Sequence, residues 1–272
     1  MIRQNPFSLY DFLGYFIPGA TLIYLMLFFS NLDSSEYAWD FNNVVGSDNV
    51  SIQNYLFFII ISYAVGHLIN FLSSILVERY GNWMYDYPSK YLLKIHKKFS
   101  FKTITIKRIG IFISILPVSI LDLLLGQLFN FKNLYVQHLD DFLIHGIKTK
   151  SSKILTELIP EDESNNLPES INDYDFFRIL HHYAFEHTKS HQFKMVNYVV
   201  LYGFLRSLTF ICVIIFWYLV YLQLFEQNEF IFAYHYLIIS LCSYIFFMAF
   251  MKFYRRYTLE ALMIIAIENK KE

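Results

Sequence analysis

The 272-residue chain has little of what most soluble enzymes carry. Charged residues make up 17% of the sequence, against about 25% in a typical soluble domain. The two cysteines, Cys212 and Cys242, both lie within long apolar runs, which excludes a disulfide framework and a CxxC redox site. With 9 glycines, loops that cradle phosphates are hard to build, and the common nucleotide, zinc-protease and serine-hydrolase motifs do not occur. We therefore expect neither an enzyme nor a cofactor site.

Apolar and aromatic side chains dominate what is present. Hydrophobic residues are 56% of the chain, and 29 Phe, 22 Tyr and 3 Trp bring the aromatic share to 20%. This excludes a disordered chain, which needs low hydrophobicity and high charge. A net charge of -1 leaves no overall nucleic-acid signature, so any electrostatic signal depends on where the charges fall. The composition indicates a protein of the lipid bilayer.

Four apolar runs have the length of about 20 residues that a helix needs to cross a bilayer. They cover 12–30, 55–77, 197–222 and 230–251. The residues before the first run include little positive charge and no small-residue cleavage site, so we read that run as a retained span.

The lysines and arginines predict the orientation of the spans, because cytoplasmic loops are enriched in them. The segment 31–54 has four acids and no base, and the link between the last two spans has two acids and no base. By contrast, 79–108 carries eight bases against one acid, and five bases follow the fourth run. This distribution predicts a multi-pass protein of the bacterial inner membrane with both termini in the cytoplasm.

The predicted fold is an all-α membrane protein with four transmembrane helices. A first hairpin covers 1–78, with its short outward loop at 31–54, and a second hairpin with a cytoplasmic C-terminal helix covers 197–272. Between them, 79–196 is expected to form a mainly helical cytoplasmic domain. Within it, 140–159 has helical periodicity, 160–170 is rich in breakers and reads as an exposed loop, and a helix beginning near Tyr174 runs into the third span.

A fifth apolar run, 109–129, competes with this topology. If it crossed the bilayer, the basic C-terminus would lie outside, and it includes Pro117, Asp122 and Gln127, which a lipid-facing helix tolerates poorly. We place it in the cytoplasmic domain or against the inner membrane face. A re-entrant segment is the alternative.

Polar side chains within the spans are the first set of candidate functional residues, because burying them in lipid is expensive. In the third span, Arg206 shares a helical face with Tyr202 and Thr209. Arg206 could line a pore or hold a ligand; the alternatives are snorkelling to the headgroups or pairing with Asp11 or Glu78.

The second span carries a polar stripe at helical spacing, and the first span contains Pro18, which can kink a helix. The stripe consists of Tyr63, His67, Asn70 and Ser74. Such a stripe either lines a wet passage or forms hydrogen bonds to another helix, and the second use is common. One chain with four spans can hardly enclose a pore. If the polar stripe lines a pore, the protein must therefore form a symmetric homo-oligomer, which we expect to be a tetramer.

The second set of candidates is basic and lies in 79–196. Lysines with neighbouring hydroxyls suit a phosphate, and basic residues also flank a group of histidines; together the candidates are Lys148, Lys150, Lys153, Arg178, His182, His187, Lys189 and Lys194. The alternatives are a solvated helix face, a domain interface, or contact with anionic lipids. The pairs His187–His191 and His182–Glu186 each have metal-ligand spacing, but they lie on helical faces well over about 100° apart and cannot form one four-ligand site. We therefore predict no metal site.

Two segments carry a resemblance to a known group of proteins. DFLGYFIPG at the start of the chain and NYVVLYGFLR at the start of the third span resemble small prokaryotic four-span effectors of anti-phage defence, and are most similar to the membrane-channel component of Hailong-type systems. The resemblance implies an oligomeric channel that depolarises the inner membrane. It also implies control by a nucleotide or short single-stranded DNA ligand on the cytoplasmic side. It assigns no ligand-binding residue.

Two functions from different classes follow. The first is a ligand-gated, oligomeric, pore-forming effector, favoured by the polar stripes, Arg206 and the basic residues of the cytoplasmic domain. The second is a membrane anchor or scaffold that recruits a partner protein through 79–196, with the polar side chains joining helices together. An intramembrane enzyme or transporter lacks a catalytic pair and an internal repeat.

Overall fold

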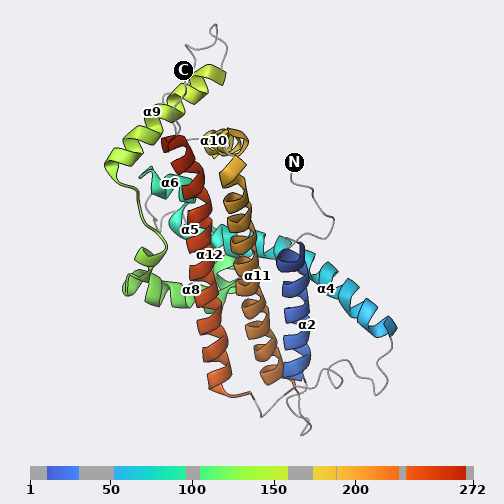
Figure 1. Ribbon diagram of the computed structural model, residues 1–272. Coiled ribbons are helices and arrows are strands. Elements are labelled where there is room, and N and C mark those ends of the chain that lie inside the picture. The colour runs from blue at the N-terminus through green and yellow to red at the C-terminus, as the bar shows by residue number, and fades with distance from the viewer. Residues whose placement is uncertain are drawn as a thin grey trace. The chain divides into compact units, whose positions relative to one another are not determined.

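The computed structural model describes residues 11–30, 52–95, 105–158, 174–187, 189–226 and 231–267. All the regular elements in these ranges are helical (Figure 1). The predicted outward loop 31–54 and exposed loop 160–170 lie almost entirely outside the described residues. The chain divides into two compact units: the first contains 1–80, 101–132 and 200–250, and the second contains 81–100, 133–199 and 251–272.

Four helical stretches are long and apolar enough to cross a membrane, and each contains one of the four predicted spans. They are Phe12–Ser30, Ile52–Leu92, His191–Phe225 and Ala233–Ile267. The first consists of the π-helix η1 (Phe12–Phe16) and α2 (Ile17–Ser30). The second begins with α4 (Ile52–Ser73) and continues through the π-helix η2 (Ser74–Glu78), α5 (Arg79–Tyr85) and α6 (Pro88–Leu92). The described residues thus confirm the prediction of an all-helical structure with four long apolar helices that could cross a membrane.

The last two spans belong to single long helices, α11 (Lys189–Phe225) and α12 (Ala233–Ile267). At 1.5 Å per residue these helices are about 50–55 Å long, well beyond the bilayer core of about 30 Å. The predicted C-terminal helix is present as a continuation of the fourth apolar run, because α12 extends without a break to Ile267. Within the first unit, α2 and the neighbouring parts of α11 and α12 run side by side, whereas α4 diverges from α2 (Figure 1).

In the first unit, α2 and α4 meet through two glycines. A Cβ atom added to Gly19 would lie 1.8 Å from the backbone oxygen of Ser62, and one added to Gly66 would lie 1.9 Å from that of Tyr15. Both distances are far below van der Waals contact, so the two backbones touch where side chains are absent. Gly14, five residues before Gly19, has open space around its Cβ direction. Pro18, the second residue of α2, lies buried beside the contact.

Aromatic side chains fill the centre of the first unit on the side of α12. Tyr80, Phe247 and Phe250 are fully buried. The ring of Phe247 lies 5.7 Å from that of Tyr80 and 6.2 Å from that of Phe250, in tilted arrangements. Such ring pairs bury large apolar areas and fix the neighbouring helices at a defined spacing.

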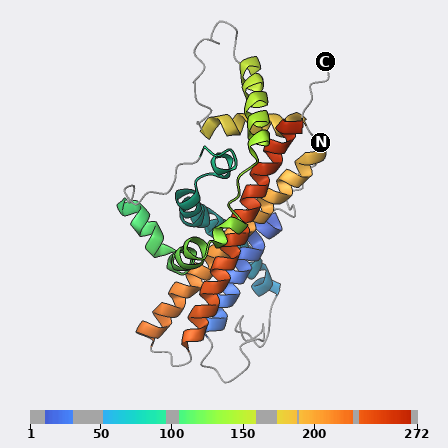
Figure 2. The same cartoon turned by 90° about the vertical axis from the view of Figure 1, so that its left-hand side faces the viewer.

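The fifth apolar run forms two arms separated by a sharp bend. The first arm is α7 (Ile106–Ser114), and the second consists of α8 (Leu116–Leu121) and the π-helix η4 (Asp122–Leu128). The two arms are bent by 94° relative to each other (Figure 2). Pro117, near the start of the second arm, cannot donate a backbone hydrogen bond, which explains why one helix does not continue through the run.

The second unit is built around α9 (Asp141–Leu158), close to the predicted helix at 140–159. Its inward face contains Ile144, Ile147 and Ile154, spaced by three and seven residues. Two apolar clusters join this face to α6, to α10 (Tyr174–His187) and to the near parts of α11 and α12. Lys94 binds Asp141 at 2.7 Å, and this hydrogen bond and charge hold the pKa of the Asp141 carboxyl below its usual range.

The helix that begins at Tyr174 does not run unbroken into the third span, as the sequence suggested. It ends at His187, and α11 starts at Lys189 in a different direction (Figures 1 and 2). The side-chain amide of Gln192 on α11 donates to the carbonyl of Phe185, 2.6 Å away. This hydrogen bond satisfies one of the carbonyls that have no partner within the helix at the end of α10. It therefore stabilises a helix break at which the sequence has no Pro or Gly.

Candidate functional site

Arg206 lies at the centre of a polar cluster between α11 and α4 in the first unit. The residue is 8% exposed. Its Nη2 donates to the Asn70 side-chain oxygen at 2.6 Å, its Nε donates to the Ser73 hydroxyl at 3.1 Å, and its Nη1 pairs with the Glu78 carboxylate. All three guanidinium nitrogens therefore have partners, and the charge is neutralised within one copy of the chain.

The π-helix η2 explains why one arginine reaches all three partners. Asn70 and Ser73 are three residues apart and share a face of α4. Glu78 is five residues beyond Ser73, which in an α-helix would rotate it by about 140° away from that face. The wider i→i+5 turn of η2 brings Glu78 back towards the face of Ser73. The sequence offered Asp11 or Glu78 as the partner of Arg206, and the structure shows the pair with Glu78.

The remaining predicted pore residues separate into two kinds. Ser74 and Thr209 donate their hydroxyl hydrogens to carbonyls of their own helices, at Phe71 and Leu205. Tyr202 packs with its ring 6.3 Å from that of Phe250. Asn70 and Arg206 bind each other, as described above. These five residues therefore have structural contacts inside the first unit.

His67 differs from the other residues of the polar stripe because it is exposed in the middle of a span. Its imidazole stacks on the Tyr15 ring at 3.9 Å and meets the Tyr63 ring edge-on at 4.6 Å. Among the described residues, its ring nitrogens have no hydrogen-bond partner. The two tyrosines thus fix the orientation of the imidazole. Its nitrogen atoms remain available for hydrogen bonds to a group outside the described residues of the first unit.

Exposed apolar side chains surround His67 on α4. The exposed fractions are 66% for Phe57, 65% for Ile60, 56% for Leu68 and 62% for Phe71. These residues repeat at helical spacing, so they form one continuous face, which we call the α4 face. An ionisable side chain at the edge of an otherwise apolar face is expensive in hydrocarbon.

The sequence assigned no partner to Asp122, the acid of the fifth apolar run. Asp122 in η4 is fully buried and accepts a hydrogen bond from the Tyr80 hydroxyl at 2.9 Å. Asp122 is the only acid in the sequence of the fifth apolar run, which indicates that its carboxylate must be buried away from lipid. Tyr80 is 42 residues away, and no local spacing connects the two.

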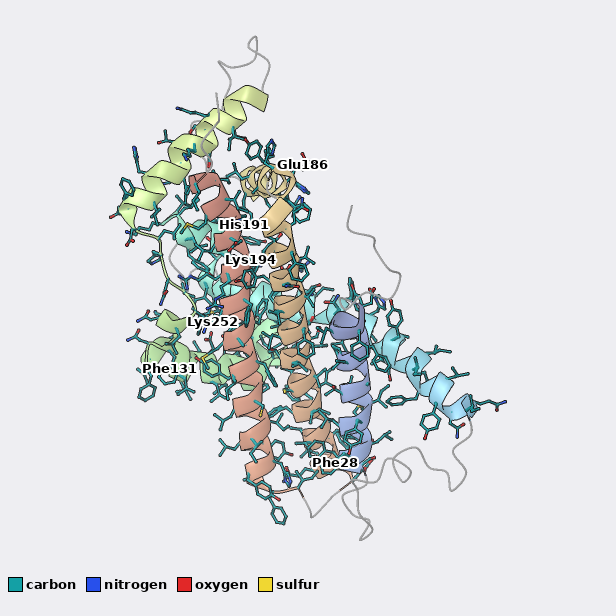
Figure 3. The ribbon with its side chains drawn as sticks, viewed as in Figure 1. Phe28, Phe131, Glu186, His191, Lys194 and Lys252 are labelled. Atoms are coloured by element: carbon teal, nitrogen blue, oxygen red, sulfur yellow. The ribbon has the colours of Figure 1, made fainter. Side chains whose placement is uncertain are left out.

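The basic candidates of the second unit lie on α9, α10 and the start of α11. Lys150 donates to the carbonyl of Ala266 at 2.7 Å, next to the end of α12, where such a cation is favourable. Lys194 is 3.8 Å from Glu260, which also binds His191 Nδ1 at 2.6 Å (Figure 3). Lys148, Lys153, Arg178, His182 and His187 are exposed or half-buried on α9 and α10, and the side chain of Lys189 lies outside the described residues.

The histidines of α10 do not converge on one point. The Nδ1 atom of His187 lies 2.9 Å from the carbonyl of Tyr183, and its ring stacks on that tyrosine. No group of three or more His, Cys, Asp or Glu side chains within the described ranges has the arrangement of a metal site. His181 was not among the candidates; its Nε2 lies 2.5 Å from the Tyr257 hydroxyl. Burial, with His182 beside it, lowers the pKa of His181 to about 4.

Comparisons with protein-family models, with curated proteins and with solved structures find no match for this chain.

Proposed function

We propose that the chain is an oligomeric, pore-forming membrane effector that acts by depolarising the membrane. The observation that carries this proposal is His67: an exposed imidazole, oriented by two tyrosines, in the middle of a helix long and apolar enough to cross a bilayer. Facing lipid, it would be strongly unfavourable. Facing a water-filled space enclosed by several copies, it would be hydrated.

The α4 face supports an assembly of copies. Its large side chains are more than half exposed in one copy. Closed symmetric assemblies bury such faces repeatedly, and in a ring of copies the same contact would place each His67 near the central axis. The tetramer remains part of this proposal.

Control by an anionic ligand is the second part of the proposal. Lys148, Lys153 and Arg178 give the second unit exposed or half-exposed positive charges, with the exposed imidazoles of His182 and His187 as further hydrogen-bond donors. Such groups suit the phosphates of a nucleotide or a short single-stranded DNA. The setting in anti-phage defence rests on the resemblance of the segments that begin the first and third spans.

Conductance of the purified protein in planar bilayers, with and without candidate oligonucleotides, tests the proposal. His67→Phe keeps a ring that can stack on Tyr15 but removes the polar atoms, so we expect unitary conductance to fall by about tenfold or more. Leu237→Ala, at an exposed apolar position of α12, is the matched control and should conduct like the wild type. A wild-type protein without conductance under every ligand condition would refute the pore.

Recruitment of a partner protein is the second candidate function. It is favoured by Phe142 on α9 and Phe193 on α11, which are 87% and 69% exposed in the second unit. Large aromatic side chains of this kind are typical anchors of protein interfaces. If the chain recruits a partner, the membrane potential of cells that express it would stay intact. The double variant Phe142→Ser and Phe193→Ser would abolish co-purification of the partner, whereas His67→Phe would not.

The ligand response has its own test. The double variant Lys148→Ala and Lys153→Ala should shift the oligonucleotide concentration for half-maximal response by about tenfold without changing conductance in the open state. The double variant Lys252→Ala and Arg256→Ala, which removes two exposed bases of α12, controls for net charge.

A further inference from the structure

The bent segment formed by α7, α8 and η4 has a surface unlike that of a soluble domain. Side chains on both arms are large, apolar and exposed: the exposed fraction is 51% for Ile113, 48% for Leu124 and 69% for Leu128, and Phe129 and Phe131 follow at 63% and 42%. Between Arg108 and Lys132 the sequence has one charged residue, Asp122. That carboxylate is fully buried against Tyr80.

Backbone carbonyl groups at the bend accept hydrogen bonds from side chains of the protein, as a non-aqueous surrounding requires. The indole nitrogen of Trp217 on α11 donates to the carbonyl of Ser114 at 2.9 Å. The hydroxyl of Ser119 donates to the carbonyl of Phe112 at 2.9 Å. In water, solvent would satisfy these carbonyls. Broken helices at membrane depth need protein donors for them, and here two side chains supply them.

The lengths of the arms exclude a complete crossing in this conformation. At 1.5 Å per residue, α7 is about 14 Å long and Leu116–Leu128 is at most about 20 Å long. Each is shorter than the hydrocarbon core of about 30 Å, and the 94° bend prevents their lengths from adding. Basic residues lie at both ends, Lys107 and Arg108 in the first turn of the first arm and Lys132 after the second arm. Under the positive-inside rule, both ends belong on the cytoplasmic side.

We propose that 106–129 is a re-entrant hairpin that enters the inner leaflet from the cytoplasmic side and returns to it. Its exposed apolar side chains contact lipid acyl chains. Lys107, Arg108 and Lys132 lie at the headgroups, where an anionic surface attracts basic residues. This inference concerns lipid contact alone and stands whether or not the chain conducts ions.

Cysteine accessibility in the full-length protein tests the topology. In a background with Cys212→Ala and Cys242→Ala, single cysteines replace Lys107, Lys132, Ile113 or Leu124, and the protein is reconstituted in phosphatidylethanolamine and phosphatidylglycerol vesicles of known orientation. We expect a membrane-impermeant maleimide to label positions 107 and 132 from the cytoplasmic side only. We expect cysteines at positions 113 and 124 to resist the maleimide from both sides. In a separate preparation, fluorophores are attached to these two cysteines in detergent without denaturant before reconstitution, and we expect nitroxide lipids to quench their fluorescence.

Three results would overturn the proposal. Labelling of positions 107 and 132 from opposite sides would mean a complete span. Rapid maleimide labelling of positions 113 and 124 would place the arms in water. Resistance to maleimide without quenching by nitroxide lipids would mean that protein covers the arms. A cysteine at Lys153, exposed in the second unit, provides the aqueous control.

A measurement on the unmodified chain covers the case in which the cysteine-free protein does not fold. Because no Lys or Arg lies between Arg108 and Lys132, trypsin releases 109–132 as one peptide after solubilisation. With lipids that carry a photoreactive group on the acyl chain, this peptide should carry adducts at a level within about threefold of the peptides from the four spans. Absence of adducts on it, with adducts on the spans, contradicts the hairpin.

Discussion

Arg206 shows how a residue of apparent functional interest can have a structural role. Its charge is embedded in a span, which made it a candidate for a pore or ligand site. The structure gives each guanidinium nitrogen a partner on α4 or η2. Removing one member of a buried pair leaves an uncompensated charge, which is far more costly than never having had the pair.

Arg206→Ala should lower the free energy of unfolding in detergent by about 3 kcal/mol or more, because Glu78 and Asn70 lose their partner in a buried site. Arg206→Lys should have an intermediate effect, since an ammonium can reach Glu78 but cannot also bind Asn70 and Ser73. Unfolding by a denaturing detergent, followed by tryptophan fluorescence, measures both. Lys252→Ala is the exposed control, and an equal loss there would show that the pair contributes nothing special.

His181 gives the second unit a pH dependence of defined sign. Its folded-state pKa of about 4 lies below the ordinary histidine value of about 6.5, so the folded state binds fewer protons than the unfolded state between these values. Stability is therefore complete above about pH 6.5 and falls as the pH drops towards 4.

Hydrogen exchange of peptides from α10 should be faster at pH 5 than at pH 7, after correction for intrinsic rates. His181→Gln removes the titrating group and retains an acceptor for the Tyr257 hydroxyl, so much of the pH effect should disappear. His145→Gln, at an exposed position of α9, should leave the pH effect unchanged. Unaltered pH dependence in His181→Gln would assign the effect to other groups.

At the scale of single elements, the helix pair α2 and α4 depends on two absent side chains. Gly19 and Gly66 each face a backbone atom at a distance that no Cβ tolerates. Neither obstacle is a flexible side-chain end that could move aside. Small residues at helix contacts in membranes permit close packing, which here replaces the driving force that water supplies elsewhere.

Gly19→Ala or Gly66→Ala should separate α2 from α4 and lower stability by more than about 2 kcal/mol, as overpacking does in tight interfaces. Gly14→Ala is a matched control because nothing lies within 4 Å of its added Cβ; it should be neutral or slightly stabilising. The thermal midpoint in detergent measures all three. Comparable midpoints for Gly19→Ala and Gly14→Ala would contradict the close contact.

The sequence was informative about elements and much less so about their contacts. Hydropathy located the four long helices, and periodicity located α9, because both signals are local. The break between α10 and α11 was missed, since its carbonyl at Phe185 is satisfied by Gln192 rather than by a local breaker. Gly66, the counterpart of Gly19, was also missed, and so was Tyr257 beside His181. Such partners depend on how distant helices cross, which no single-chain periodicity encodes.

At the scale of the whole molecule, the placement of bases predicts which side of the membrane each loop occupies. The predicted four spans would place both termini in the cytoplasm, and the proposed re-entrant hairpin would preserve this even number. If 106–129 crossed instead, the bases after Met251 would lie outside.

Reporter fusions test this arrangement in cells. A fluorescent protein that matures only in the cytoplasm should be bright when fused after residue 272, and alkaline phosphatase inserted near residue 45 should be active. A dark C-terminal fusion together with an active insertion at 45 would indicate an odd number of crossings. A fusion truncated after residue 225 provides the control, because it should place the phosphatase outside.

The contact between Gly19 and Gly66 also limits how descendants of this sequence can diverge. Exposed apolar positions such as Phe57 or Ile60 can exchange one apolar residue for another with little effect on the contact between α2 and α4. The two glycines cannot, because a single methyl group at either position would overlap a carbonyl oxygen of the other helix. We therefore expect distant relatives of this chain to retain two glycines, one directly after the equivalent of Pro18 and one in the middle of the second long helix, even where most other residues differ.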